Sequence, residues 1–268
     1  MKKFRIIGMV LVAIFMGVNF TSCKPDDKKD PTENPVEKPR KRLVYFNVDD
    51  KITFLKYDDQ GHLIEYSDVI GPYTYTYTYV WGENTIDITI DADGISQEKC
   101  TLNLENGLAS GISENPYTFT SSFKYNSTNR LIECEYFMGN RKLEWNDDKL
   151  IKINKESSIS TGSETYAYDK NYTTKGYNPL TPYFVTTDML YVAHPELAGL
   201  ATNKLFDRED DIIILNDQEN ASSYKYEYEF DEDGYVKKIT IRHNEEGCDH
   251  IINEYTFVWE YPTNWLHS

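Results

Sequence analysis

Short stretches in which apolar and polar residues alternate recur along most of the chain. Each ends in an aromatic residue followed by Asp or Asn, then a turn, then a second alternating stretch. Examples are the segments 54–64, 123–132, 143–153 and 228–236. A period of two is typical of strands with one buried face, and turns built on Asp, Asn and Gly favour hairpins. The pattern predicts an antiparallel meander of roughly a dozen or more strands.

The fold class that follows is all-β. So many strands seldom remain one open sheet, and they either curl toward a barrel or pack as two layers. The pattern leaves both arrangements open. The chain contains 22 Tyr among its 14% aromatic residues, which also favours strands over helices. We therefore expect residues 43–268 to form a single all-β domain.

One segment, Leu180 to Arg208, departs from the alternation. Within it, residues 188–200 predict a short helical insert, with Pro195 near a helix start and Gly199 near a stop. We expect this insert to close one end of the sheet, in preference to acting as a lid over an active site.

The N-terminus has the layout of a secretory signal peptide. Lys2, Lys3 and Arg5 precede an apolar run that is too short to span a bilayer as a helix. The run ends at Phe20-Thr21-Ser22-Cys23, which resembles a lipobox. We expect residues 1–22 to be removed and Cys23 to carry the lipid. The alternative is an ordinary signal peptide followed by a chance cysteine.

Residues 23–42 are predicted to be a disordered tether, because proline and charged residues dominate them and no aromatic occurs. Lys24-Pro25-Asp26-Asp27 resembles the lysine-plus-acidic signal that directs Bacteroidetes lipoproteins to the cell surface. We expect an outer-membrane lipoprotein exposed at the surface. A tether that faces the periplasm is the alternative.

The charge of the chain excludes one class of partner. Without residues 1–22 it keeps 25 of its 28 basic residues and all 44 acidic ones, which gives a net charge of 25 − 44 = −19 with His neutral. Such a surface repels phosphate backbones, so no nucleic-acid binding is expected.

The cysteines do not form a disulfide framework. Cys100, Cys134 and Cys248 remain after Cys23 is lipidated, and the first two lie on apolar strand faces. We expect a strand at 117–125 to separate Cys100 from Cys134 by about 9–10 Å, too far for a disulfide. Both are predicted to be buried thiols.

No catalytic motif is present, and we assign no catalytic residue, metal ligand or cofactor. The segment His243–His250 could bring two imidazoles and a thiol together, but it is also an ordinary hairpin tip. The segments 91–94 and 231–234 begin like calcium loops but lack the later ligands, which indicates turns. No two carboxylates stand out as a glycosidase pair.

A row of aromatic residues is the most informative candidate site. Tyr73, Tyr75, Tyr77, Tyr79 and Trp81 share one face of a predicted strand, opposite three threonines. They could form an exposed platform that stacks sugar rings. The preferred alternative is that they cover one face of the sheet as part of the core.

The hairpins, the lipoprotein start and the helical insert together resemble a Bacteroidetes lipoprotein family of unknown function with a porin-like β-fold. The resemblance is clearest in the segments 198–205 and 224–239 and covers most of residues 50–261. It implies a barrel-like fold, but the family carries no established activity or site residues.

The leading functional hypothesis is a non-catalytic binding module, anchored to the membrane through its lipid, that binds glycans or host polymers. The alternative is a structural or assembly protein that docks another envelope protein. A transmembrane barrel is a third option, which the many tyrosines along whole strands disfavour.

Overall fold

A computed structural model describes residues 39–48, 51–70, 72–93, 96–113, 122–136, 139–186, 189–215, 217–244 and 250–262. The predicted signal peptide, the predicted lipidation site Cys23 and Cys248 lie outside these residues. The described residues fall in one compact unit that begins at Pro39.

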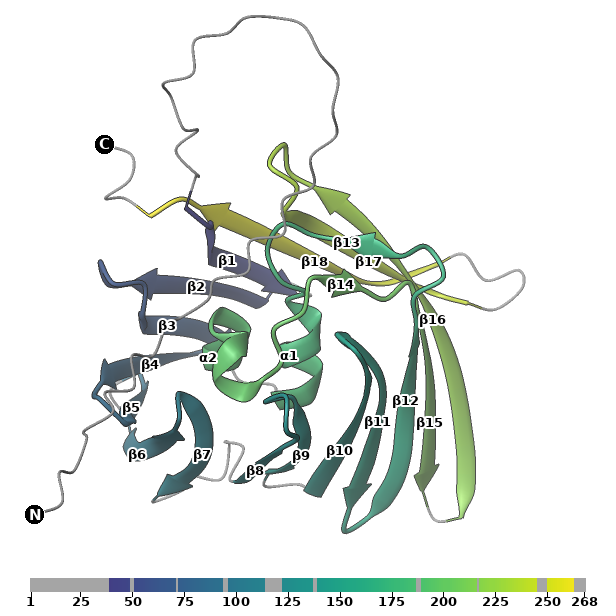
Figure 1. Cartoon of the computed structure of the whole chain (residues 1–268), viewed down its shortest axis with the longest axis horizontal. Coiled ribbons are helices and arrows are strands. Elements are labelled where there is room, and N and C mark those ends of the chain that lie inside the picture. The colour runs from purple at the N-terminus through teal and green to yellow at the C-terminus, as the bar shows by residue number, and fades with distance from the viewer. Residues whose placement is uncertain are drawn as a thin grey trace, which may run out of the picture. The chain divides into compact units, whose positions relative to one another are not determined.

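Sixteen antiparallel strands close into a barrel (Figure 1). Neighbours along the chain pair with each other, and β1 closes the ring by pairing with β18. The all-β prediction is confirmed, and of its two alternatives the barrel is correct. The strands are β1 (Arg42–Val48), β2 (Lys51–Tyr57), β3 (Leu63–Ile70), β4 (Tyr73–Trp81), β5 (Thr85–Ala92), β6 (Ser96–Glu105), β7 (Leu108–Ser113), β8 (Ser122–Tyr125), β9 (Leu131–Tyr136), β10 (Gly139–Asn146), β11 (Lys149–Ser157), β12 (Ser160–Ala167), β15 (Arg208–Leu215), β16 (Gln218–Phe230), β17 (Val236–His243) and β18 (Ile251–Glu260).

The segment between β12 and β15 leaves the wall and lies inside the ring of strands (Figure 1). We call Tyr172–Leu205 the plug. It contains β13 (Tyr172–Thr173), α1 (Leu180–Thr186), α2 (Met189–Ala193), the 3-10 helix η1 (Pro195–Ala198) and β14 (Lys204–Leu205). Most of its apolar side chains are buried, and the predicted insert is confirmed, although helix begins earlier than expected, at Leu180.

The ends of η1 follow the predicted signals. Pro195 begins it, and Gly199 follows it with φ +61°. A Cβ at Gly199 would lie 2.1 Å from the carbonyl oxygen of Asn129, so a side chain has no room there. The plug therefore depends on glycine where it meets a hairpin of the wall.

The aromatic-Asp repeat marks one end of the barrel, which we call the closed end because the plug binds there. Asp58 Oδ1 accepts the backbone N–H groups of Gly61 and His62, and Asp231 Oδ1 accepts those of Asp233 and Tyr235. Asn126 does the same in its own hairpin. The predicted turn chemistry is confirmed, because each acidic or amide side chain closes its turn.

In seven hairpins an aromatic residue at or near the turn has a second role that the sequence did not reveal. Its hydroxyl or indole N–H donates to a backbone carbonyl near the start of the preceding wall strand, and we call this contact the aromatic clamp. Leu104, at the corresponding place in β6, has no donor group, and neither has Phe230, so that Tyr228 is the clamp of its hairpin. The clamp pairs are Tyr57–Leu43 (2.7 Å), Trp81–Leu63 (2.8 Å), Tyr125–Ala109 (2.7 Å), Trp145–Leu131 (2.7 Å), Tyr168–Leu150 (2.9 Å), Tyr228–Phe206 (2.6 Å) and Trp259–Val236 (2.6 Å).

Cys100 and Cys134 are buried thiols, as predicted. Their expected spacing was wrong, because both β7 and β8 lie between β6 and β9. Three strand intervals place the two cysteines roughly 14 Å apart around the wall. The error arose because Leu108–Ser113 is a strand of its own.

Candidate functional site

We call the end of the barrel opposite the plug the mouth. Side chains that face inward become exposed there. On β4, Tyr79 is 2% exposed and Tyr73 is 47% exposed, although both point inward. On β15, Glu209 is 6% exposed, whereas Ile213 and Leu215, on the same face, are 42% and 43% exposed. The inward-facing side chains at this end are therefore accessible to solvent.

The predicted tyrosine row lies on this inner face of β4, and the structure divides it between two environments. Tyr79 is buried, and Trp81 serves as an aromatic clamp. Tyr77 stacks on Tyr66 of β3, with ring centroids 4.3 Å apart and planes 9° apart. Tyr73 and the half-buried Tyr75 lie nearest the mouth. The deep end of the row is core, and only its outer end can meet a ligand.

A charged wall, which the sequence analysis missed, lies on the inner faces of β11, β12 and β15. Lys155 forms an ion pair with Glu164, which also accepts a hydrogen bond of 2.7 Å from Tyr166. Glu209 accepts a hydrogen bond from Tyr226 of β16. The two carboxylates are thus satisfied by donors on three strands, β11, β12 and β16, as buried charges require.

The wall holds more negative than positive charge. Asp211 stands directly opposite Glu164 across the β12–β15 ladder, and like charges in that position repel. Burial raises the pKa of Glu209 and of Asp211, and the Lys155 ammonium nearby opposes both shifts. Burial lowers the pKa of Lys155. The wall is therefore acidic and poorly solvated.

The charged wall also connects to the plug. Arg141 of β10 donates hydrogen bonds to the carbonyl oxygens of Phe184 and Val185 in the last turn of α1. A cation at the C-terminal end of a helix satisfies carbonyl groups that lack partners within the helix. This contact fixes α1 against the same side of the barrel.

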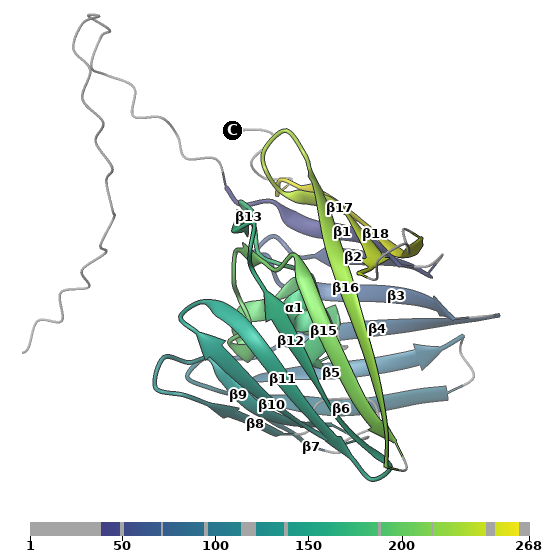
Figure 2. The same ribbon diagram turned by 90° about the vertical axis from the view of Figure 1, so that its right-hand side faces the viewer.

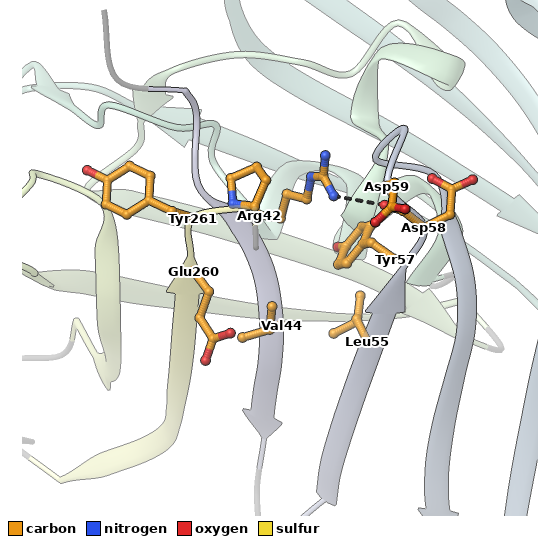
Figure 3. Close-up of a pocket in the computed structure, with 9 residues that line it drawn as sticks. Arg42, Val44, Leu55, Tyr57, Asp58, Asp59, Glu260 and Tyr261 are labelled. Carbon is orange, nitrogen blue, oxygen red and sulfur yellow. Dashed lines mark hydrogen bonds between the residues drawn. The ribbon is translucent and has the colours of Figure 1, made fainter. Parts of the chain in front are cut away.

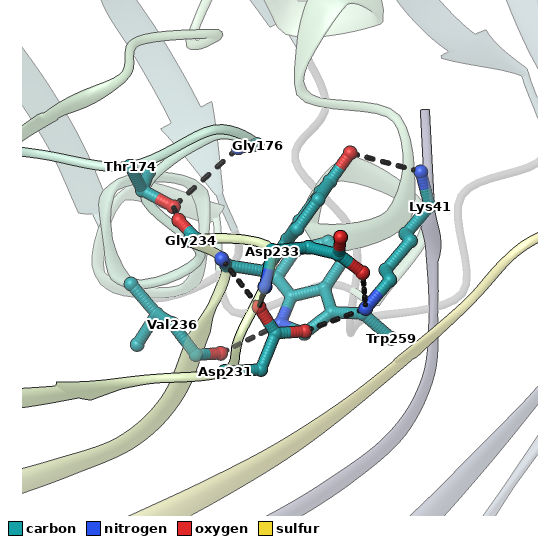
Figure 4. A network of polar contacts seen from close by, with 9 residues as sticks. Lys41, Thr174, Gly176, Asp231, Asp233, Gly234, Val236 and Trp259 are labelled. Atoms are coloured by element: carbon teal, nitrogen blue, oxygen red, sulfur yellow. Dashed lines mark hydrogen bonds and ion pairs between the residues drawn. The ribbon is translucent and has the colours of Figure 1, made fainter. Parts of the chain in front are cut away.

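The calcium-like turn at 231–234 is occupied by a side chain of the protein. Lys41 Nζ lies 2.7 Å from both Asp231 Oδ2 and Asp233 Oδ2 (Figure 4). The backbone N–H of Lys41 also donates to Tyr235 Oη at 3.0 Å. Gly234 has φ +87°, which confirms the turn.

The predicted tether ends earlier than expected. Although Lys41 and Arg42 were assigned to the tether, both contact the barrel at its closed end.

The imidazoles of the histidine-rich hairpin are close together. The rings of His243 and His250 have centroids 4.7 Å apart. The residues 245–249 between them lie outside the described part of the chain. Within the described part, no group of three or more His, Cys, Asp or Glu residues is arranged to hold a metal.

A small pocket of about 130 Å³ lies at the closed end, between β1 and β2 (Figure 3). Ladder pairing between these strands begins only at Tyr45 and Phe54, so the strands diverge there. Arg42 donates to the Asp58 carbonyl across the gap at 3.1 Å, and Tyr57 is the local clamp. The pocket is smaller than typical ligand sites, and these polar groups are already engaged.

The chain matches no protein-family model and no curated protein. It is similar in structure to a porin-like protein from Bacteroides vulgatus ATCC 8482, with TM-score 0.56 and 14% identity over 81% of this chain and 98% of that one. A porin-like protein from Bacteroides uniformis ATCC 8492 gives TM-score 0.55 and 15% identity over 85% of this chain and 100% of that one. At this identity, what the chain shares with the Bacteroides porin-like proteins is the barrel fold.

Proposed function

We propose that this chain is a non-catalytic binding lipoprotein that takes a glycan or a similar polymer at its mouth. The observation that carries the proposal is the inward row on β4, whose exposure rises from 2% at Tyr79 to 47% at Tyr73. Aromatic rings at a solvent-accessible rim are suited to stacking against the apolar face of a sugar ring.

Binding is favoured over catalysis by the state of the acidic side chains. A glycosidase needs a carboxyl group free to donate a proton and a second one free to attack or to activate water. Glu164 is held by Lys155 and Tyr166, and Glu209 is held by Tyr226. These contacts suit a structural or ligand-orienting role.

The outward faces of the strands support a barrel held at the membrane by a lipid on Cys23. Ion pairs cross them at Lys56–Glu65, Lys124–Glu133 and Lys238–Glu254. Charged groups on a lipid-facing surface are costly at mid-height, so such a wall suits water. No helix among the described residues is long and apolar enough to cross a membrane. The proposed location is the outer membrane, facing the cell exterior.

The test is a polysaccharide screen, followed by affinity measurements on two variants of β4. Tyr73→Ala removes the exposed ring, and we expect at least about tenfold weaker binding with an unchanged melting temperature. The matched control, Thr78→Ala, alters an exposed outward position on the same strand. Equal affinity of the parent and Tyr73→Ala, or no binding to any polysaccharide, would refute the proposal.

A second candidate function, docking to another envelope protein, is supported by a different observation. Residues 212–215 of β15 are all exposed, which leaves three isoleucines and a leucine in contact with solvent. Aliphatic side chains exposed in succession are typical of protein contact surfaces. This function predicts that a co-purifying protein is lost when Ile213 is replaced by Ser, with polysaccharide binding unaffected.

A further inference from the structure

The hairpin formed by β15 and β16 extends beyond its neighbour β17 (Figures 1 and 2). We call residues 212–215 and 218–221 the hairpin tip. Every residue of the tip is exposed, including neighbours that point to opposite faces of the sheet. Both faces of the tip therefore meet solvent, unlike those of the barrel wall.

The tip also has a free strand edge. β16 pairs with β15 along residues 218–225, but its pairing with β17 begins only at Tyr224 and His243. The last contact on that side is from the Asn244 N–H to the Ser223 carbonyl, at 2.8 Å. Among the described strands, none pairs with the outer edge of residues 218–222.

The direction of the edge groups follows from strand geometry. In an antiparallel strand the N–H and C=O of one residue point to the same side, and successive residues alternate. Because the Ser223 carbonyl points toward β17, the groups of Glu219 and Ala221 point to the free edge as well. Those of Asn220 point to β15, where Asn220 is paired with Ile213.

This edge lacks most of the features that usually protect an exposed strand. Natural edges carry charged residues, lysine above all, or proline or a bulge, because a bare edge pairs with other strands. Residues 218–222 contain no lysine or proline, and the β15–β16 ladder has no register shift, which leaves Glu219 as their single charge. Beside them lies the exposed aliphatic run of β15. A sparsely protected edge of this kind is suited to being covered by another strand.

We propose that the edge is covered by a second copy of this chain, through two-fold antiparallel pairing of β16 with β16 centred on Asn220. This register places Glu219 of each copy opposite Ala221 of the other. A centre at Glu219 would set two glutamates face to face, which is unfavourable. A centre at Ala221 would require Ser223, whose carbonyl is already bonded. The sequence of the edge thus fits itself in one register.

The resulting dimer is head to head. β16 begins at the mouth and ends at the closed end, so antiparallel pairing brings the two mouths together and directs the two closed ends away from each other. The inference rests on none of the residues of the proposed ligand site, because Tyr73 lies on β4, on another part of the ring.

The test combines sedimentation velocity with cysteine crosslinking on the full chain in mild detergent. The parent should form a dimer whose population rises with concentration. Ala221→Glu should weaken the dimer at least about tenfold, because the two-fold axis repeats the clash with Glu219. Ala221→Lys, the matched variant, should keep or strengthen it, because it places a lysine opposite Glu219 in both copies.

Crosslinking reports the register directly. Residues on the two-fold axis lie about 4.5–5.5 Å apart, within disulfide range. Asn220→Cys should therefore form a covalent dimer on mild oxidation, whereas Ser222→Cys should not, because its two copies would be more than about 10 Å apart. A monomer at all concentrations, equal effects of Ala221→Glu and Ala221→Lys, or equal crosslinking at both positions would overturn the proposal. Capture of a different protein by an edge that does not dimerise would overturn it as well.

Discussion

At the scale of single residues, the aromatic clamp explains why most of the turn-end positions are Tyr or Trp. Phenylalanine would supply the same apolar ring, but only a hydroxyl or an indole N–H can satisfy the carbonyl that it reaches, such as that of Leu43 or Leu131. A buried carbonyl without a partner costs more than the mean value of a hydrogen bond. The clamp therefore stabilises the closed end one hairpin at a time.

Removing one clamp hydroxyl should lower the free energy of unfolding measurably. For Tyr57→Phe we expect a loss of about 1–2 kcal/mol in denaturant unfolding, because the Leu43 carbonyl loses its partner while packing is kept. Tyr73→Phe is the control, since its ring is 47% exposed and its hydroxyl makes no clamp. Equal stability of Tyr57→Phe and the parent would show that the clamp contributes nothing.

At the scale of elements, the hairpins were predictable because their signals are local. Asp58 and Asn126 close turns within four residues, and Pro195 and Gly199 bound η1 in the same way. The closure of β1 on β18 was not predictable, because it joins strands from opposite ends of the chain. The misjudged spacing of Cys100 and Cys134 has a different cause, because the strand Leu108–Ser113 between them was not anticipated.

The charged wall escaped the sequence analysis for a related reason. Glu164, Glu209 and Asp211 alternate along their strands in the way that a solvated face does. Only the closed ring turns this face inward and brings Lys155 and Tyr226 onto it. The tyrosine row of β4 was visible in the sequence, but its division into core and mouth depends on where the plug lies.

The charged wall predicts a pH-dependent stability. Burial raises the pKa of Glu209 above its unfolded value, so the folded state binds the proton more tightly than the unfolded state. The free energy of unfolding should fall as pH rises from below the pKa of Glu209 in the unfolded chain, near 4.3, through its raised pKa in the folded protein. Glu209→Gln cannot ionise, so it should be more stable than the parent at pH 7 and equal to it below about pH 4.

The measurement is denaturant unfolding of both proteins at the two pH values. Glu156→Gln is the control, because Glu156 is exposed on the outward face of β11 and should show no such difference. If Glu209→Gln were less stable than the parent at pH 7, the ionised carboxylate would be favourable in its site. The acidic wall would then be a source of stability.

At the scale of the whole molecule, the two ends of the barrel have different roles. Lys41 fixes the entry of the chain at the closed end, where the plug and the clamps lie. At the mouth, which is the opposite end of the barrel, the inward-facing side chains of the strands are exposed, as at Tyr73 and Ile213. The chain therefore enters the barrel at the end opposite the mouth.

Loss of the lipid should release the protein without unfolding it. We expect Cys23→Ala to move from the membrane fraction to the soluble fraction with an unchanged melting temperature, because the outward faces carry ion pairs suited to water. Cys248→Ala should remain in the membrane fraction. Quantitative retention of Cys23→Ala in membranes would contradict the lipid anchor or the water-facing wall.

The central claim, that the ligand binds at the mouth, is tested most directly by hydrogen–deuterium exchange with and without the polysaccharide selected by the screen. Protection is expected in peptides that cover residues 73–77 of β4, with none in the closed-end turns around Asp58 and Asp231. Protection confined to those turns or spread evenly over the barrel, or no change at β4 under saturating polysaccharide, would contradict the account.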